Sequence, residues 1–226
     1  MTSTPSPGDP VASIHVDGSD PDSPTPDSPA PDSRAQREHD APRTKRPYDR
    51  RALRSASSLV LVNTGHGKGK STAAFGTLVR AVARDWPSAV VQFLKSGTWH
   101  TGEEKVCRGL GVEWFSAGDG FSWDSADLDE SRAKAVAAWV FSQELIRAGA
   151  HRLIVLDEVS YPMSWGWIDP AEVAATLSDR PQDTTVILTG REMAQEVIDV
   201  ADTVTEMVKV KHAFDQGIRA RKGIDY

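Results

Sequence analysis

The feature that most constrains the fold is a strand, a glycine-rich loop and a helix that follow one another between residues 58 and 84. Residues 58–63 form a short apolar run rich in valine and leucine, which predicts a buried β-strand. The loop reads Thr-Gly-His-Gly-Lys-Gly-Lys-Ser-Thr over residues 64–72, and an alanine-rich stretch with helical spacing extends from residue 70 to residue 84. A strand that passes through glycines into a helix is typical of α/β proteins.

The rest of the chain alternates between strands and helices in the same way. Further strands are expected at residues 89–94, 112–115, 152–157 and 184–189, with an edge strand at 204–210. Helices are expected at residues 127–148, 170–179 and 192–201. The strand segments are continuous apolar runs, which indicates that both faces of the sheet are covered. We therefore predict a three-layer α/β fold with a mostly parallel sheet and a ligand site at the carboxyl ends of its strands.

The first fifty residues differ in composition from the rest of the chain. Ten of the 14 prolines lie there, and large apolar side chains are almost absent. Such a segment cannot bury enough surface to offset the entropy lost on ordering. We therefore expect a disordered extension over residues 1–50 and one folded domain over residues 51–226. The extension ends in a run of arginines and lysines, which could contact nucleic acid or an acidic partner or serve only as a solvated linker.

Charge and cysteine content exclude several classes of protein. The chain carries 26 Lys and Arg residues against 32 Asp and Glu residues, a net charge of −6 that argues against a general nucleic-acid binder. Cys107 is the single cysteine, so no internal disulfide or cysteine-rich metal site is expected. No apolar run approaches the roughly 18 residues that a membrane-spanning helix needs. We expect a cytoplasmic protein with neither nucleic acid nor membrane as a partner.

The glycine-rich loop has the features of a phosphate-binding loop. Its three glycines would let backbone N–H groups converge on phosphate oxygens at the positive end of the following helix. Lys70 would reach the phosphates, and Ser71 would offer its hydroxyl to Mg²⁺. The usual motif begins with glycine at the position of Thr64, so this loop is one residue short. The alternative is a surface turn. The expected phosphate-binding residues are Thr64, Gly65, His66, Gly67, Lys68, Gly69, Lys70, Ser71 and Thr72.

Two carboxylates follow the apolar strand at residues 152–157. Asp157 ends this strand and Glu158 comes next, so both are expected at the carboxyl edge of the sheet. A phosphate-bound Mg²⁺ needs oxygen ligands there, and Ser71, Asp157 and Glu158 are the predicted metal ligands. Without the phosphate loop, an Asp-Glu pair after a strand would be interpreted as a helix cap or a turn.

The loop and several later segments resemble the ATP:corrinoid adenosyltransferases of the cob(I)yrinic acid a,c-diamide type. The resemblance extends from about residue 59 to residue 226. The short phosphate loop is this family's own form. The similar segments, in the family's order, are residues 64–76, Val91-Gln-Phe-Leu-Lys95 with Gly102-Glu103, Gly120-Phe-Ser-Trp123, Val155-Leu-Asp-Glu158, Leu188-Thr-Gly-Arg191, and the C-terminal residues 210–217 and 223–226.

The resemblance implies an activity, a fold and a set of ligands. The family transfers the 5′-deoxyadenosyl group of ATP to the Co(I) centre of a reduced corrinoid and releases triphosphate, on a RecA-like fold that is usually a homodimer. Lys70 and Mg²⁺ would then stabilise the leaving triphosphate, and the nucleotide would lie reversed relative to an ATPase. Arg191 is expected at the nucleotide. His212 is expected either at the nucleotide or corrinoid or in a local cap. A flavoprotein-type reductant is compatible with this chemistry.

Two aromatic residues carry the expected corrinoid chemistry. Phe121 and Trp123 match the family's Gly-Phe-x-Trp segment, whose aromatic side chains are thought to cover the lower face of the corrin and displace its axial ligand. A four-coordinate Co(II) is easier to reduce to Co(I), and apolar side chains would exclude water from it. The alternative is that both residues pack in the core.

Two other functions are compatible with the motifs. In a RecA-like ATPase, Lys70 and Glu158 would serve hydrolysis of the γ-phosphate, and the products would be ADP and phosphate in place of triphosphate. In a nucleotide-dependent binding module, no turnover would occur. No segment of the sequence identifies the corrin side chains that are recognised, so the preferred corrinoid is left open.

Overall fold

The computed structural model describes residues 52–96, 101–118 and 128–225. Contacts divide the chain into two units, Met1–Leu53 and Arg54–Tyr226, and every strand and helix below belongs to the second unit. The expected extension over residues 1–50 lies outside the described residues, so it remains a prediction.

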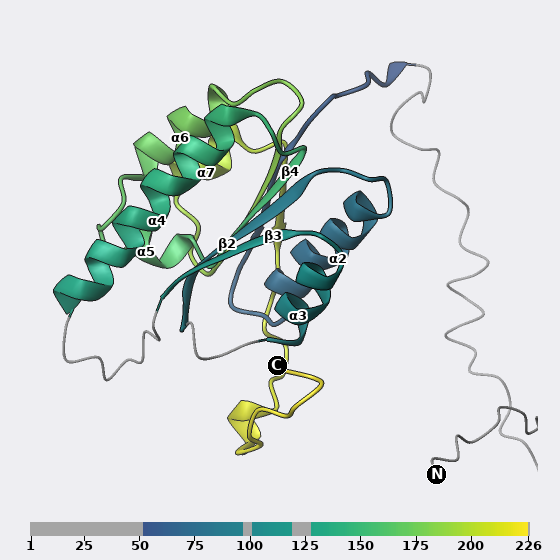
Figure 1. Ribbon diagram of the computed structural model, residues 1–226. Helices are drawn as coiled ribbons and strands as arrows, with labels where there is room; N and C mark the ends of the chain where they lie inside the picture. The colour runs from purple at the N-terminus through teal and green to yellow at the C-terminus, as the bar shows by residue number, and fades with distance from the viewer. Residues whose placement is uncertain (1–51, 97–100, 119–127, 226) are drawn as a thin grey trace, which may run out of the picture. The chain divides into compact units, whose positions relative to one another are not determined.

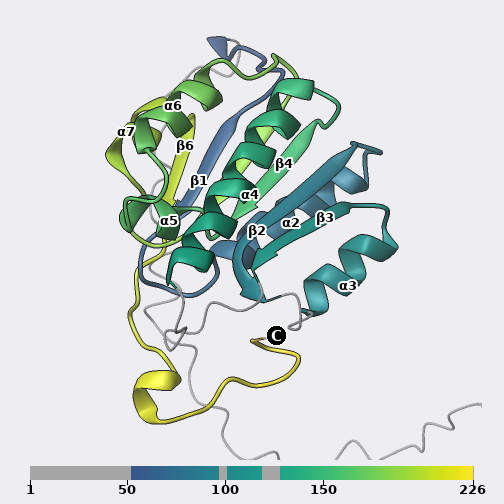
Figure 2. The same cartoon turned by 60° about the vertical axis from the view of Figure 1, so that its left-hand side comes forward.

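The centre of the fold is a six-stranded sheet in the order β3-β2-β4-β5-β1-β6 (Figures 1 and 2). All neighbouring strands are parallel, which confirms the predicted sheet. The carboxyl ends of its strands therefore lie along one edge. The strands are β1 (Val60–Thr64), β2 (Ser88–Ser96), β3 (Glu113–Gly118), β4 (Leu153–Asp157), β5 (Thr185–Thr189) and β6 (Thr203–Glu206).

Helices cover the sheet on both sides, so the predicted three-layer α/β fold is confirmed (Figure 1). One layer holds α2 (Lys70–Val82) and α3 (Gly102–Gly109). The helices of the other layer are α4 (Leu128–Ala148), α5 (Ser160–Ser164), α6 (Pro170–Ser178) and α7 (Gln195–Val200). Among the helices of the described residues, none is long and apolar enough to cross a membrane.

The central strands are buried because their side chains alternate between two apolar layers. All five residues of β4 are buried. Ile154 and Leu156 pack in the cluster that includes Trp139 of α4, while Val155 packs with Leu78 of α2 in the other cluster. Each fully buried aliphatic side chain contributes roughly 1.5–3 kcal/mol to folding. This two-sided burial accounts for the continuous apolar runs in the sequence.

Three features differ from the expectations. Strand β6 ends at residue 206 and not at residue 210, and its four residues are all exposed at the edge of the sheet. Helix α5, with Pro162 inside it, and a 3₁₀ turn at Phe214–Gln216 were not predicted. Segments of five and three residues are too short to show helical periodicity.

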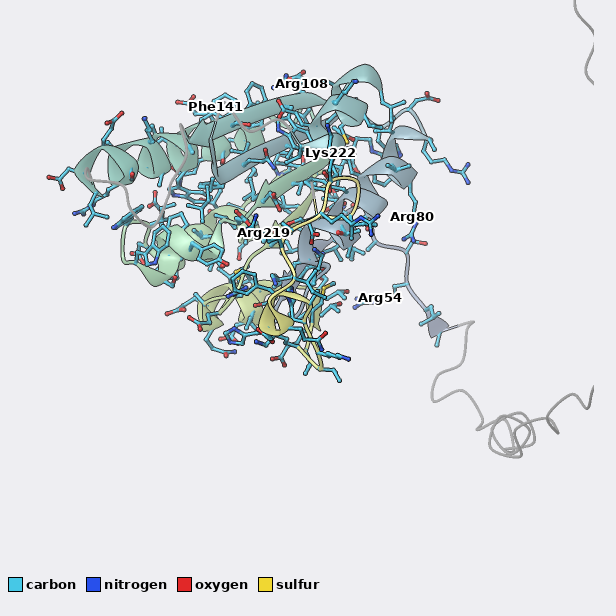
Figure 3. The ribbon with its side chains drawn as sticks, turned by 90° about the horizontal axis from the view of Figure 1, so that it is seen from below. Arg54, Arg80, Arg108, Phe141, Arg219 and Lys222 are labelled. Carbon is cyan, nitrogen blue, oxygen red and sulfur yellow. The ribbon has the colours of Figure 1, made fainter. Side chains whose placement is uncertain are left out.

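The segment after β6 runs along the edge where the strands end and returns toward the start of α2 and α3 (Figures 1 and 2). Figure 3 views this side of the molecule, where Arg219 and Lys222 mark the segment. The edge of the sheet that was expected to hold the ligand site therefore has the chain's last residues close to it.

Candidate functional site

The glycine-rich loop connects β1 to α2 as the sequence predicted. Strand β1 ends at Thr64, and α2 begins at Lys70. Gly65 and Gly69 have φ angles of 92° and 113°, in the left-handed region that favours glycine. Gly69 directly precedes α2, and no side chain caps this helix, so its first N–H groups are available to an anion.

A second reason for two of the glycines is the close approach of Met207, which follows β6. The Gly67 N–H donates to the Met207 carbonyl at 2.5 Å, and the Met207 N–H donates to the Thr64 carbonyl at 2.8 Å. A Cβ on Gly65 or Gly67 would lie 2.6 Å from the Met207 carbonyl oxygen. The sequence predicted that glycine N–H groups converge on phosphate, whereas the Gly67 N–H is bonded to the protein itself.

The loop lines a cleft of about 280 Å³ at the carboxyl edge of the sheet. Most of the predicted site residues meet there, but Thr64, Gly65 and Asp157 are not among the described residues that line it. The lining residues are His66, Gly67, Lys68, Gly69, Lys70, Ser71, Thr72, Glu103, Glu158, Tyr161, Arg191, His212, Ile224 and Asp225.

Lys70 and Arg191 are two of the three Lys and Arg residues that line the cleft, and their charges influence each other. The Lys70 ammonium donates to the Gly67 carbonyl at 2.6 Å, which holds it against the loop. Burial lowers the pKa of Lys70, the Arg191 guanidinium lowers it further, and Glu158 opposes both effects. Two cations that repel each other in a half-buried cleft are stabilised by an anion placed between them.

The two carboxylates among the predicted metal ligands occupy different surroundings. Asp157 is fully buried, and its carboxylate accepts hydrogen bonds from Thr189 Oγ1 at 2.8 Å and Gln92 Nε2 at 3.2 Å. Glu158 lines the cleft, and its backbone has a φ angle of 63°, which is rare for a residue with a side chain. The structure therefore brings Glu158 to the cleft and holds Asp157 between the neighbouring strands β2 and β5.

Four lining residues were not predicted as site residues from the sequence: Glu103, Tyr161, Ile224 and Asp225. Tyr161 lies on α5, shortly after the Asp157-Glu158 pair, and burial raises the pKa of its hydroxyl. Ile224 and Asp225 come from the C-terminal segment, where the Asp225 carboxylate pairs with Lys68 and accepts the Arg221 N–H at 2.7 Å. The one signal for the last two was the similarity of residues 223–226 to the family.

The predicted histidines lie at the rim of the cleft. His66 Nε2 is 3.7 Å from a Glu192 carboxylate oxygen. His212 lines the cleft, and its Nδ1 accepts the N–H of Phe214, which is a local turn contact.

The predicted aromatic pair and the cysteine have different outcomes. Phe121 and Trp123 lie outside the described residues; β3 ends at Gly118, just before them. Cys107 packs in the core with residues of α2, and burial, followed by the charge of Glu103, raises the pKa of its thiol.

These features define a class of protein. A glycine-rich loop joins the first strand of a parallel sheet to a helix that begins with a lysine, and a carboxylate lines the same cleft as this lysine. This arrangement is typical of a phosphate-loop nucleotide-binding site. The family model described as "ATP:corrinoid adenosyltransferase BtuR/CobO/CobP" matches residues 56–226, and the chain belongs to this family.

Curated proteins of the same name agree with that assignment. The chain is 38% identical over 186 residues to the corrinoid adenosyltransferase of Escherichia coli K12, which covers 81% of this chain and 94% of the relative. It is 41% identical over 168 residues to the corrinoid adenosyltransferase CobA of Salmonella typhimurium, with 74% and 85% covered. The corrinoid adenosyltransferase of Pseudomonas aeruginosa is 40% identical over 175 residues, with 76% and 86% covered.

Proposed function

We propose that this protein transfers the 5′-deoxyadenosyl group of ATP to the Co(I) centre of a reduced corrinoid and releases triphosphate. The observation that carries the proposal is the family match over residues 56–226, which includes the phosphate loop and the cleft beside it. Generic phosphate-loop ATPases share the loop but not the remaining segments, so we favour this activity over ATP hydrolysis or nucleotide-dependent binding alone.

The chemistry asks the protein to stabilise charge on a leaving group. Co(I) attacks the 5′ carbon of ATP, the bond from this carbon to the triphosphate oxygen breaks, and the electron pair leaves with triphosphate. Lys70, Arg191 and the N–H groups at the start of α2 would balance that charge in a half-buried cleft. Holding the cobalt atom in line with the 5′ carbon and its leaving oxygen would supply much of the remaining rate acceleration.

The reaction requires no general base, because the nucleophile carries no proton. Tyr161 agrees with this, since burial raises the pKa of its hydroxyl above the ordinary value of 10.0. Near neutral pH it therefore remains protonated and can donate a hydrogen bond to a phosphate or ribose oxygen. Its place beside Arg191 and Glu158 would suit a positioning role.

Mg²⁺ is the metal that accompanies ATP in this proposal. Within the described part of the chain, no group of three or more His, Cys, Asp or Glu residues could form a metal cage. This suits Mg²⁺, which commonly takes one or two protein ligands and completes its shell with phosphate oxygens and water. Ser71 and Glu158 would hold it in the cleft, with Asp157 behind them. When bound, the metal would draw charge from the triphosphate.

Further parts of the proposal rest on resemblance to the family. Phe121 and Trp123 would cover the lower face of the corrin, and a flavoprotein-type reductant would supply the electron that produces Co(I). We also propose a cytoplasmic homodimer.

The test is an anaerobic assay with chemically reduced cobalamin and MgATP. We expect loss of the Co(I) absorbance together with release of one triphosphate per adenosylated corrinoid. Lys70→Ala should lower the rate about 10²–10³-fold, because one stabilising contact to the developing charge is removed. Lys105→Ala, an exposed lysine on α3 that does not line the cleft, is the control and should retain full activity. Release of ADP and phosphate in place of triphosphate would contradict the proposal.

A further inference from the structure

The end of strand β5 supports the one carboxylate of the Asp-Glu pair that reaches the cleft. We infer that Thr189 is a positioning residue that fixes Glu158 toward a metal-bound triphosphate. The inference rests on the proposed function, in which Glu158 is a Mg²⁺ ligand. The inference adds to the site a residue that does not itself line the cleft.

The Thr189 hydroxyl joins the two acidic residues of the neighbouring strand end. It donates to Asp157 Oδ1 at 2.8 Å and accepts the backbone N–H of Glu158 at 2.9 Å. Thr189 is fully buried, so water does not replace these bonds easily. The parallel register of β4 and β5, with Leu156 beside Leu188, places the three residues together.

The backbone at Glu158 needs such support. Its φ angle of 63° is unfavourable for a residue with a side chain and persists only where surrounding bonds hold it. The hydroxyl that accepts the Glu158 N–H is itself oriented by the Asp157 carboxylate. Fixing this backbone conformation fixes the direction in which the Glu158 side chain leaves the strand.

The buried carboxylate is held from its other side as well. Gln92 of β2 donates to Asp157 Oδ2 at 3.2 Å and accepts the indole N–H of Trp114 at 3.1 Å. The turn after Thr189 is equally tight, because a Cβ on Gly190 would lie 1.9 Å from Ser160 Oγ. The Thr189 hydroxyl therefore links a carboxylate that is held on both sides to the backbone of the cleft residue Glu158.

Only a hydroxyl can act as donor and acceptor here, and this sets the experiment. Thr189→Val keeps the shape and removes both bonds, whereas Thr189→Ser keeps them. Thr185→Val is the matched control, because Thr185 is buried in the same strand and its hydroxyl accepts the Leu59 N–H at the opposite end. Glu158→Gln serves as the reference for losing the proposed ligand.

The measurements use the full chain, with Mn²⁺ as the probe for the metal site. We expect Thr189→Val to weaken Mn²⁺ binding in the presence of triphosphate about tenfold, the lower end of the range for residues that orient metal ligands. The Mg²⁺ concentration for half-maximal adenosyl transfer should rise by a similar factor. Thr189→Ser and Thr185→Val should stay close to wild type in both measurements.

The outcomes that differ from these expectations would each contradict either the role of Thr189 or the metal role of Glu158. Normal Mn²⁺ binding by Thr189→Val, with weakened binding by Glu158→Gln, would overturn the role of Thr189. Equal losses in Thr189→Val and Thr185→Val would assign the effect to general destabilisation and overturn it too. Normal binding by Glu158→Gln would overturn the metal role of Glu158, and with it this inference. If Thr189→Val does not fold, Thr189→Ala removes the same hydroxyl with a smaller side chain and is judged by the same criteria.

Discussion

Replacing Gly67 by alanine tests whether the backbone contact with Met207 shapes the phosphate loop. The added Cβ would lie 2.6 Å from the Met207 carbonyl oxygen, 2.7 Å from the Met207 carbonyl carbon and 2.8 Å from the Val208 carbonyl carbon. All three atoms are backbone, so no side chain can rotate away. Reaching even the 3.0 Å that real Cβ contacts rarely fall below requires the loop or the Met207 segment to move by about 0.4 Å or more.

That movement should affect both stability and binding. Forcing an extra carbon into a packed site typically costs about 1–3 kcal/mol. For a domain of this size each kcal/mol lowers the melting temperature by roughly 2–4 °C, so we expect a decrease of about 2–12 °C. Because the same movement shifts the N–H groups at the start of α2, we also expect ATP to bind about tenfold more weakly.

Gly76→Ala is the matched control, measured by thermal denaturation and titration calorimetry with MgATP. A Cβ on Gly76, inside α2, meets no atom within 4 Å, and alanine is favoured over glycine in a helix by about 0.5–1 kcal/mol. This variant should melt about 1–4 °C higher and bind ATP normally. A Gly67→Ala protein with the melting temperature and ATP affinity of wild type would refute the reasoning.

Three further predictions concern the cleft and the corrinoid. Asp225→Asn should strengthen binding of inorganic triphosphate about two- to fivefold in calorimetry, because phosphate no longer competes with a carboxylate for Lys68; weaker binding would mean that Asp225 itself holds the ligand. Burial and Arg191 lower the pKa of Lys70 from 10.5, so this lysine loses its charge at a pH where an ordinary lysine is still charged. We therefore expect kcat/KM for ATP to fall with rising pH in that range. Lys70→Arg should remove this alkaline loss, because arginine stays charged. Phe121→Ala or Trp123→Ala should impair transfer that starts from Co(II) with a weak protein reductant, and prereduced Co(I) should restore most of it; equal losses with a lower melting temperature would return both residues to the core.

The sequence was sufficient for the parts of the fold that burial governs. Strands β4 and β5 are buried at every residue, and their apolar runs therefore predicted them closely. Strand β6 is exposed at all four residues and is held by pairing with β1, so its sequence carries little information about its end. Helix α5 is one short turn fixed by its neighbours, and no periodicity can reveal it.

The site was predictable where one local segment holds the chemistry. The phosphate loop, Lys70 and Glu158 follow from short motifs, and the structure brings them to one cleft. The roles of Thr189 and Met207 depend on bonds between segments far apart in the chain, which spacing cannot reveal. The same holds for Asp225, whose partner Lys68 lies near the other end of the folded domain.

The bonds between the phosphate loop and Met207 have a consequence for folding, because they join segments far apart in the chain. Strand β1 and helix α2 are made early in synthesis, whereas Met207 follows the last strand of the sheet. Contacts between residues so distant in the chain close late and slowly. ATP can stabilise only molecules whose loop is already complete, so it should slow the undocking of β6 without assisting earlier intermediates. We therefore expect affinity for ATP to appear only after β6 and Met207 have docked on the loop.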